Sequence, residues 1–275
     1  MKKIIMQGQS TYDGAGVKLK RMFAHDHTKL TDPFLLLDHF GSDNSDEYMK
    51  GFPWHPHRGI ETVTYMLGGA VNHGDNIGNA GTIGPGDIQW MTAGGGVIHQ
   101  EMPVPSDGGM FGLQLWVNLP ASHKMMTPRY RGILASEVTV VKTPQAEVLV
   151  IAGVYEDVEG PVRDLIVDVG YLECHLAPGA SFPHETRKDY TSFFYLISGA
   201  AEVDGARLEA AELALFTQPG RFEVQATADA RYIFVTGQKL HEPIAWGGPI
   251  VMNTQKELEE AFRELDEKTF LAKRP

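Results

Sequence analysis

Short apolar runs, separated by turn residues, repeat along almost the whole chain. Runs of four to eight β-branched, aliphatic and aromatic residues stop at Gly, Pro, Asn or Asp. This density of turn residues between short runs is typical of a sandwich or barrel of β-strands. The clearest predicted strands span 62–67, 88–91, 112–117, 147–151, 165–169, 171–176, 193–197 and 232–236.

Two parts of the chain resemble each other. The segment 64–70 (TYMLGGA) is similar to 194–200 (FYLISGA), and the Pro-Gly-Asp of 85–87 has a weaker counterpart at Ala211-Glu212. An internal duplication of one β-domain is the simplest explanation. The β pattern is weakest between Pro128 and Gln145, so we expect one domain at 1–135 and another at 136–275.

The C-terminal end has a different period. Thr254 and Glu257 form a capping box. Leu258, Ala261, Phe262 and Leu265 follow at helical spacing. We therefore predict one amphipathic helix at the end of the second domain, packed on a barrel.

Length and charge limit the classes of protein. A chain of 275 residues has room for two domains of ordinary size. The formal net charge of −11 argues against direct binding of nucleic acid, which needs a basic surface. The short basic run 18–21 is interpreted as a solvated strand or turn.

The N-terminal sequence and the single cysteine bear on location. Only three apolar residues follow Lys2-Lys3, too few for a signal peptide, and no run reaches the roughly 20 apolar residues of a membrane span. Cys174 has no partner for an internal disulfide, and on a strand it faces away from His175. We expect a cytoplasmic protein in which Cys174 is a buried apolar residue.

Two short motifs are candidates for chemistry. His55-Pro-His57 and His99-Gln-Glu101 each place two side chains on one face of a strand. Three imidazoles and a carboxylate suit iron, nickel, copper, zinc or manganese, with positions left open for substrate. A single such pair on a surface strand is often not a metal site, but two pairs about forty residues apart suit neighbouring strands. By parity, Glu61 remains an alternative ligand at this point.

Longer segments resemble the pirin family of bicupins. The residues that carry the resemblance lie at 34–41 (FLLLDHFG), 52–65 (FPWHPHRGIETVTY), 86–103 (GDIQWMTAGGGVIHQEMP), 112–119 (GLQLWVNL) and 248–254 (GPIVMNT). The first two cupin motifs are also present in altered form. Gly51 lies two residues closer to the histidines than usual, while Gly94 and Pro103 replace the usual Pro and Asn of the second motif.

The resemblance implies an all-β fold of two tandem cupin barrels, with a metal in the first barrel only. It also implies that the ligands are His55, His57, His99 and Glu101, and that the metal is iron(II). Nickel, copper, manganese and zinc are the alternatives. The resemblance selects Glu101 over Glu61. In the second half His184-Glu185 has no matching pair, so we expect no metal there. His25-Asp26-His27 repeats the spacing without a partner pair and is interpreted as a polar loop.

Two functions follow from the resemblance. The first is a quercetin 2,3-dioxygenase, which opens a flavonol ring with O₂, with Glu101 as both ligand and base for the flavonol hydroxyl. The alternative is an iron-dependent, redox-sensing regulator that acts through protein contacts, although the sequence identifies no protein partner. We expect a monomer. Candidates for an apolar substrate pocket are Phe34, Phe52, Trp54, Met91, Met110 and Leu113, and Asp38, His39 and His73 are candidates for its border.

Overall fold

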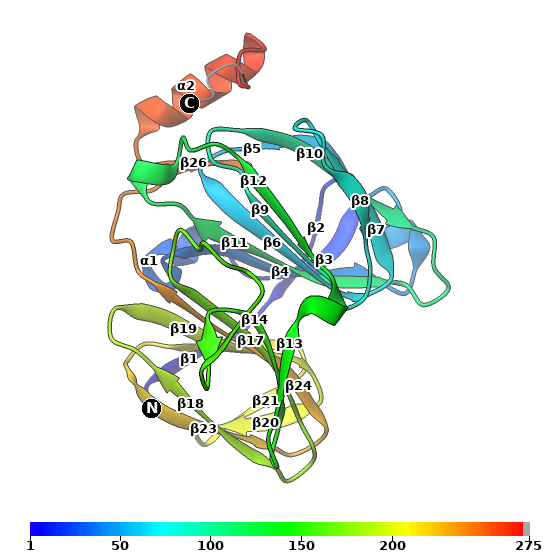
Figure 1. The fold of residues 1–275 in the computed structure, drawn as a ribbon, viewed down its shortest axis with the longest axis vertical. Coiled ribbons are helices and arrows are strands. Elements are labelled where there is room, and N and C mark those ends of the chain that lie inside the picture. Colours follow the sequence, from blue (N-terminus) through cyan, green and yellow to red (C-terminus); the bar gives the residue numbers. More distant parts are fainter. Residues whose placement is uncertain (272–275) are drawn as a thin grey trace. The chain divides into compact units, whose positions relative to one another are not determined.

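Two units, each built from two antiparallel sheets, make up the described residues 1–271 of this computed structural model (Figure 1). We call them the first and the second barrel. The first barrel contains Ser10–His27, Phe34–Ala135 and the described residues from 240 to 271. The second contains Met1–Gln9, Thr28–Pro33 and Ser136–Lys239. The predicted all-β fold is confirmed.

The first barrel has a seven-stranded and a four-stranded sheet. In order, the larger sheet contains β12 (Arg129–Ile133), β9 (Ile88–Thr92), β6 (Ile60–Gly68), β11 (Met110–Asn118), β4 (Phe34–Ser42), β3 (Val17–Phe23) and β2 (Gln9–Asp13). The smaller contains β5 (Phe52–His57), β10 (Val97–Val104), β7 (Ala70–Asp75) and β8 (Ala80–Ile83). A hairpin of β25 (Ala245–Gly247) and β26 (Ile250–Met252) and the helix α2 (Gln255–Asp266) complete this unit.

The second barrel repeats this plan. Its larger sheet contains β1 (Lys3–Gln7), β22 (Glu212–Phe216), β19 (Tyr190–Ser198), β24 (Ala230–Gln238), β17 (Val169–Leu176), β14 (Glu147–Ala152) and β13 (Thr139–Lys142). Its smaller sheet contains β18 (Ser181–Thr186), β23 (Gly220–Ala226), β20 (Ala200–Val203) and β21 (Ala206–Glu209). The remaining elements are β15 (Val154–Tyr155), β16 (Val158–Glu159), α1 (Thr28–Thr31), and the 3₁₀ turns η1 (His25–His27), η2 (Ser45–Glu47), η3 (Ala121–His123) and η4 (Ala135–Glu137).

The local sequence echoes occupy equivalent places in the two barrels. Gly69 joins β6 to β7 and Gly199 joins β19 to β20, both with positive φ (69° and 84°). A Cβ atom at either glycine would collide with a facing carbonyl oxygen. Gly86 and Ala211 also have positive φ and donate their N–H groups to the equivalent carbonyls of Met66 and Leu196. The duplication inferred from sequence is therefore visible in the backbone.

The ends of the chain depart from the expected domains 1–135 and 136–275. The N-terminal strand β1 pairs with β22 and is the edge strand of the second barrel's larger sheet (Figure 1). The helix α2 contacts β25 and β26 and belongs to the first barrel. Terminal strands and helices join whichever unit offers an open edge or apolar groove, and sequence order alone does not specify this choice.

The predicted C-terminal helix is confirmed. Thr254 caps α2, and both hydrogen bonds of the capping box with Glu257 are present. Leu258 and Ala261 are buried as their spacing predicts. The helix also buries Glu264, which forms an ion pair with the buried Arg58 (2.8 Å). A charged residue on the inner face of this helix was not predicted.

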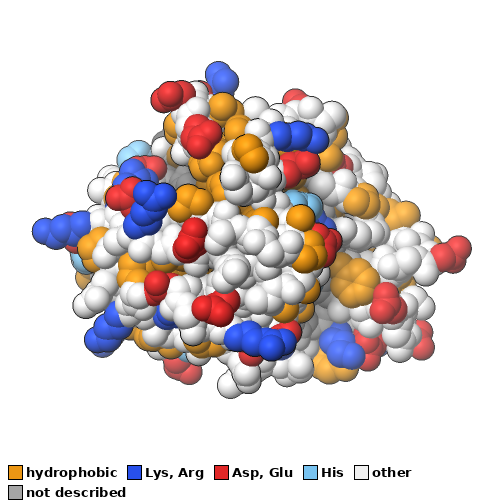
Figure 2. Space-filling view, turned by 90° about the horizontal axis from the view of Figure 1, so that it is seen from below, with side chains coloured by type: hydrophobic (Ala, Val, Ile, Leu, Met, Phe, Trp, Pro, Cys, Tyr) orange, Lys and Arg blue, Asp and Glu red, His pale blue; other side chains and the backbone are white. Residues whose placement is uncertain are grey.

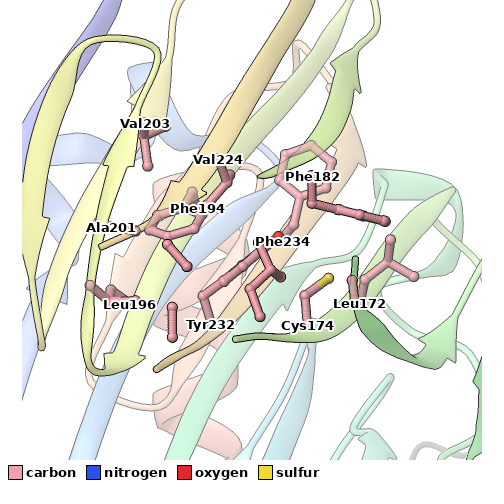
Figure 3. Close-up of a cluster of buried hydrophobic side chains, with 14 of the residues drawn as sticks. Leu172, Cys174, Phe182, Phe194, Leu196, Ala201, Val203, Val224, Tyr232 and Phe234 are labelled. Atoms are coloured by element: carbon pink, nitrogen blue, oxygen red, sulfur yellow. The ribbon is translucent and has the colours of Figure 1, made fainter. Parts of the chain in front are cut away.

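The interior of the second barrel is filled with apolar side chains from both of its sheets. Phe182, Phe194, Tyr232 and Phe234 point into this core together with Cys174 (Figure 3). Cys174 is fully buried, as expected. The strand predicted at 165–169 is wrong, because β17 begins only at Val169. Asp164 has a φ of 54°, which bends the chain just before that segment.

Charged side chains of both signs lie on the surface of the molecule. On the face drawn in Figure 2, Lys and Arg side chains are interspersed with Asp and Glu side chains. Of the helices within residues 1–271, none has the length and apolar composition to cross a bilayer.

Candidate functional site

Three histidines converge inside the first barrel. His55 and His57 lie on β5, His99 lies on β10, and these strands pair with His99 directly opposite His55. One ring nitrogen from each histidine lies within 4.8 Å of the others. Within residues 1–271 this is the one group of His, Cys, Asp and Glu found with metal-binding spacing.

The imidazoles are held in a form that suits metal binding. The Nδ1 atom of His55 lies 2.8 Å from the carbonyl oxygen of Pro53, and that of His57 lies 3.3 Å from Pro249 O. A carbonyl only accepts, so each Nδ1 carries the hydrogen and each Nε2 keeps a free lone pair. His99 Nε2 is buried without a hydrogen-bond partner among the described residues. A bound cation would satisfy all three nitrogens.

Burial keeps these rings neutral. It lowers the pKa of His57 and His99 well below 6.5, and the neighbouring histidines lower both values further. Burial also lowers the pKa of His55, against an opposing hydrogen bond to Pro53. The neutral imidazole is the form that ligates transition metals, so the cluster needs no proton removal near neutral pH.

Glu101 follows on the same face of β10 as His99. The strand alternates buried and half-buried residues, and both His99 and Glu101 are buried. Burial raises the pKa of Glu101 to about 7, although the hydroxyl of Thr64, 3.0 Å from its Oε1, acts in the opposite direction. The side chain also lines the same pocket as His55 and His57.

Glu61 lies in a different environment. Its carboxylate is fully buried and accepts hydrogen bonds from Arg131 (3.1 Å) and from the hydroxyl of Thr92. Glu61 lies on β6, in the other sheet, and does not line the pocket of the histidine cluster. The parity argument from His57 fails because Gly59, with a φ of 78°, turns the chain between the two strands.

A pocket of about 540 Å³ opens onto His55, His57 and Glu101. Of the six apolar residues expected to form it, Phe52 and Trp54 line it. The other four are fully or almost fully buried in the barrel and do not line the pocket: Phe34, Met91, Met110 and Leu113. Tertiary packing therefore decides which apolar residues reach the pocket, and sequence composition does not.

An aromatic wall that sequence reasoning missed runs from the cluster toward the rim. Trp116 packs edge-on against His57, with ring centroids 5.2 Å apart, and Trp246 lies 5.9 Å beyond Trp116. Trp246 stacks on His25 at 3.7 Å, and its indole N–H donates to Gly248 O. Trp246 comes from the C-terminal hairpin, so no local sequence signal could have placed it here.

Other predicted residues have varied positions. His25 lines the pocket, whereas His27 does not. Asp38 borders the pocket, but its neighbour His39 does not. His73 is buried and contacts the hydroxyl of Tyr130 at 2.8 Å.

The second barrel offers no comparable group within the described residues. Its buried His184 contacts the hydroxyl of Tyr232 at 2.9 Å. The rings of Phe182, Phe222 and Phe234 surround it, with centroids 4.3 to 5.4 Å away. The second barrel therefore has a single histidine packed against aromatic side chains, and this histidine also lines a pocket of about 710 Å³.

Two double-sheet barrels in tandem, with a histidine cluster inside the first, define a bicupin. The Pirin profile matches residues 16–117, and the profile of the Pirin C-terminal cupin domain matches residues 171–271. A pirin-like protein of Caulobacter vibrioides is 40% identical over 97% of both chains, and the pirin of Homo sapiens is 38% identical over 91% of this chain and 87% of that protein. The chain belongs to the pirin family.

A solved structure has a similar fold over nearly the whole chain. The quercetin 2,3-dioxygenase of Acinetobacter baumannii superposes with a TM-score of 0.89. It is 34% identical in sequence, and the match covers 98% of this chain and 99% of that one.

Proposed function

We propose that the first barrel binds one divalent transition metal, iron(II) in the cell, through His55, His57, His99 and Glu101. The observation that carries this proposal is the buried, unpartnered Nε2 of His99, which faces two histidines whose own Nδ1 atoms are tied to carbonyls. Leaving such a nitrogen without a partner is costly unless a ligand completes it.

We further propose that the protein is a dioxygenase that opens flavonol-type aromatic enols with O₂. When bound, the metal supplies Lewis-acid stabilisation of a substrate enolate and activation of O₂. The name of the Acinetobacter structure and the pocket beside the cluster support this substrate class. The aromatic wall of Trp116 and Trp246, which both line the pocket, provides apolar contacts for a planar ring.

The protein's own residues would do the remaining work. A carboxylate oxygen of Glu101 accepts the proton of the substrate enol, and Thr64 holds that carboxylate by its hydroxyl. The carbonyls of Pro53 and Pro249 fix the orientation of His55 and His57. The aromatic wall of Trp116 and Trp246 excludes water from the reacting carbon atoms.

Turnover is tested directly with the full chain. Protein loaded anaerobically with iron(II) receives quercetin and then O₂, and the loss of flavonol absorbance and the release of carbon monoxide are followed. We expect metal-dependent turnover, and its loss in His57→Ala. A His184→Phe variant is the control, because it changes a buried histidine in the other barrel. Absence of turnover with metal bound would refute the dioxygenase and favour the alternative, a metal-dependent regulator.

The ligand set is tested by metal analysis. We expect one metal per chain in the wild type and in His184→Phe, and little metal in Glu101→Ala. Glu61→Ala should keep its metal, because Glu61 pairs with Arg131 away from the pocket. If Glu61→Ala loses the metal and Glu101→Ala keeps it, the proposed assignment is wrong. Protein purified without added metal identifies the ion.

A further inference from the structure

A row of polar side chains crosses the pocket at one register of the larger sheet. Thr64 on β6 is the cross-strand partner of Gln114 on β11, Gln114 is the partner of Asp38 on β4, and Asp38 is the partner of Arg21 on β3. Directly opposed residues on neighbouring strands point to the same face. We call these four residues the polar row. Gln114, Asp38 and Arg21 all line the pocket.

Hydrogen bonds connect both ends of the polar row. At one end, the Thr64 hydroxyl lies 3.0 Å from Glu101 Oε1 and 2.7 Å from Gln114 Oε1. At the other end, Arg21 Nε donates to Asp38 Oδ1 (2.9 Å) and Nη2 donates to Asp38 Oδ2 (2.7 Å). The polar row thus runs from the carboxylate beside the histidine cluster to a partly buried ion pair farther along the pocket.

The charge of this region disfavours anions. Among the residues that line the pocket, Arg21 is the one Arg or Lys. Its Nη2 also donates to Asp13 Oδ2 at 2.7 Å. Two carboxylates therefore already occupy the guanidinium. A third carboxylate, brought by a ligand, would lie close to Asp38, which is only 4% exposed. Repulsion between like charges is strong where water is excluded.

An apolar band lies beside the polar row on the same face. Leu36 and Trp116 are cross-strand partners, two residues along β4 and β11 from Asp38 and Gln114, and both line the pocket. A flat ring on this band has the polar row along one edge. Each oxygen of Asp38 accepts one hydrogen bond from Arg21 and keeps a lone pair for a hydroxyl donor.

We propose that the polar row determines the specificity of the pocket: it selects uncharged aromatic ligands that carry hydroxyl groups away from the reacting enol, and it rejects ligands with a carboxylate there. Asp38 accepts a hydrogen bond from such a hydroxyl, and Gln114 supplies a second polar contact. This inference rests on the proposed function only for the placement of the enol next to the histidine cluster.

Binding without turnover tests the inference separately from catalysis. The full chain is loaded with zinc(II), which is not redox-active, and is titrated calorimetrically with three probes. Quercetin has distal hydroxyls, 3-hydroxyflavone has none, and 4′-carboxy-3-hydroxyflavone carries a carboxylate. We expect the wild type to bind quercetin about tenfold more tightly than 3-hydroxyflavone, the size of one hydrogen bond to a charged acceptor. The carboxylate should bind most weakly.

Asp38→Asn should change the order of the probes. Its preference for quercetin should largely disappear, and its affinity for the carboxylate should rise by about tenfold relative to 3-hydroxyflavone, because Arg21 loses one of its two carboxylate partners. A merely structural role would not produce such a gain. Leu36→Met, two residues away on the same strand, is the control and should affect all three probes equally.

Two results would overturn the inference. One is equal binding of quercetin and 3-hydroxyflavone by the wild type. The other is a uniform change for all three probes in Asp38→Asn. If that variant does not fold, Gln114→Leu decides the question, because it should weaken quercetin alone. Selective binding without turnover would support the specificity role and refute only the dioxygenase.

Discussion

Replacement of Arg58 should show how strongly the C-terminal segment stabilises the first barrel. Arg58 is 2% exposed and directly follows His57. Its guanidinium forms the ion pair with Glu264 and donates to the carbonyls of Gly95 (2.8 Å) and Phe270 (2.7 Å). The group also lies 4.0 Å from the centroid of the Phe270 ring. One side chain thus joins β5, the loop before β10 and the end of α2.

The expected cost follows from this burial. Arg58→Met removes one partner of a buried ion pair, which typically costs about 3–5 kcal/mol because the other charge loses its compensation. A domain of this size is stable by about 5–15 kcal/mol. The variant should therefore be folded but marginal. Arg58 also holds Gly95, which lies four residues before His99, so the affinity of the histidine cluster for metal should fall as well.

Tryptophan fluorescence isolates the effect to one barrel. The four tryptophans, at positions 54, 90, 116 and 246, all belong to the first barrel. Urea unfolding followed by their emission gives the free energy of unfolding of that barrel for the wild type, Arg58→Met, Glu264→Leu and the double variant. We expect the double variant to be no less stable than Arg58→Met, because no buried carboxylate is left uncompensated. If the stability losses of the two single variants add up to the loss of the double variant within about 0.5 kcal/mol, the ion pair does not couple the two residues and the reasoning fails.

Three further predictions concern other parts of the fold. Burial lowers the pKa of His184 to about 3, so below about pH 6.5 the unfolded chain binds a proton that the folded chain does not, and the free energy of unfolding falls by about 1.4 kcal/mol per pH unit down to pH 3. In thermal melts, the stability of His184→Phe should therefore depend less steeply on pH in this range than that of the wild type. An unchanged pH dependence would contradict this prediction. Gly199→Ala should destabilise the second barrel more than Gly179→Ala. Both glycines have positive φ, but of the two only Gly199 faces a carbonyl oxygen at close range. Equal denaturation midpoints for the two variants would show that this close contact does not determine the loss of stability. Thr254→Ala should cost about 1 kcal/mol by removing the cap of α2, whereas Thr254→Ser should cost little.

The second barrel shows which features the two halves of this chain share. Its sheet orders match those of the first barrel, Gly199 lies at the place of Gly69, and Ala211 lies at that of Gly86. What differs is the filling, since His184 is enclosed by Phe182, Phe222 and Phe234 where the first barrel has converging histidines. Strand geometry fixes where inward-facing side chains point, so substitutions at such positions change the chemistry of a barrel's interior without changing its sheets.

Much of this protein could be predicted from local patterns. The period of two on strands, the turn glycines and the capping box each depend on neighbours in sequence, so they identify the β-rich fold, the duplication and the last helix. The same period places His55 with His57, and His99 with Glu101, on single strand faces. Resemblance to the pirin family then favoured Glu101 over Glu61.

Tertiary structure alone decided what lies around those pairs. Gly59 turns the chain into another sheet and carries Glu61 away to Arg131. Strand pairing between segments distant in sequence assembles the polar row. The C-terminal hairpin brings Trp246 to His25 and Pro249 to His57. Spacing along one strand is a local property of the backbone, whereas the partners of that strand depend on which distant edges and apolar faces are buried together.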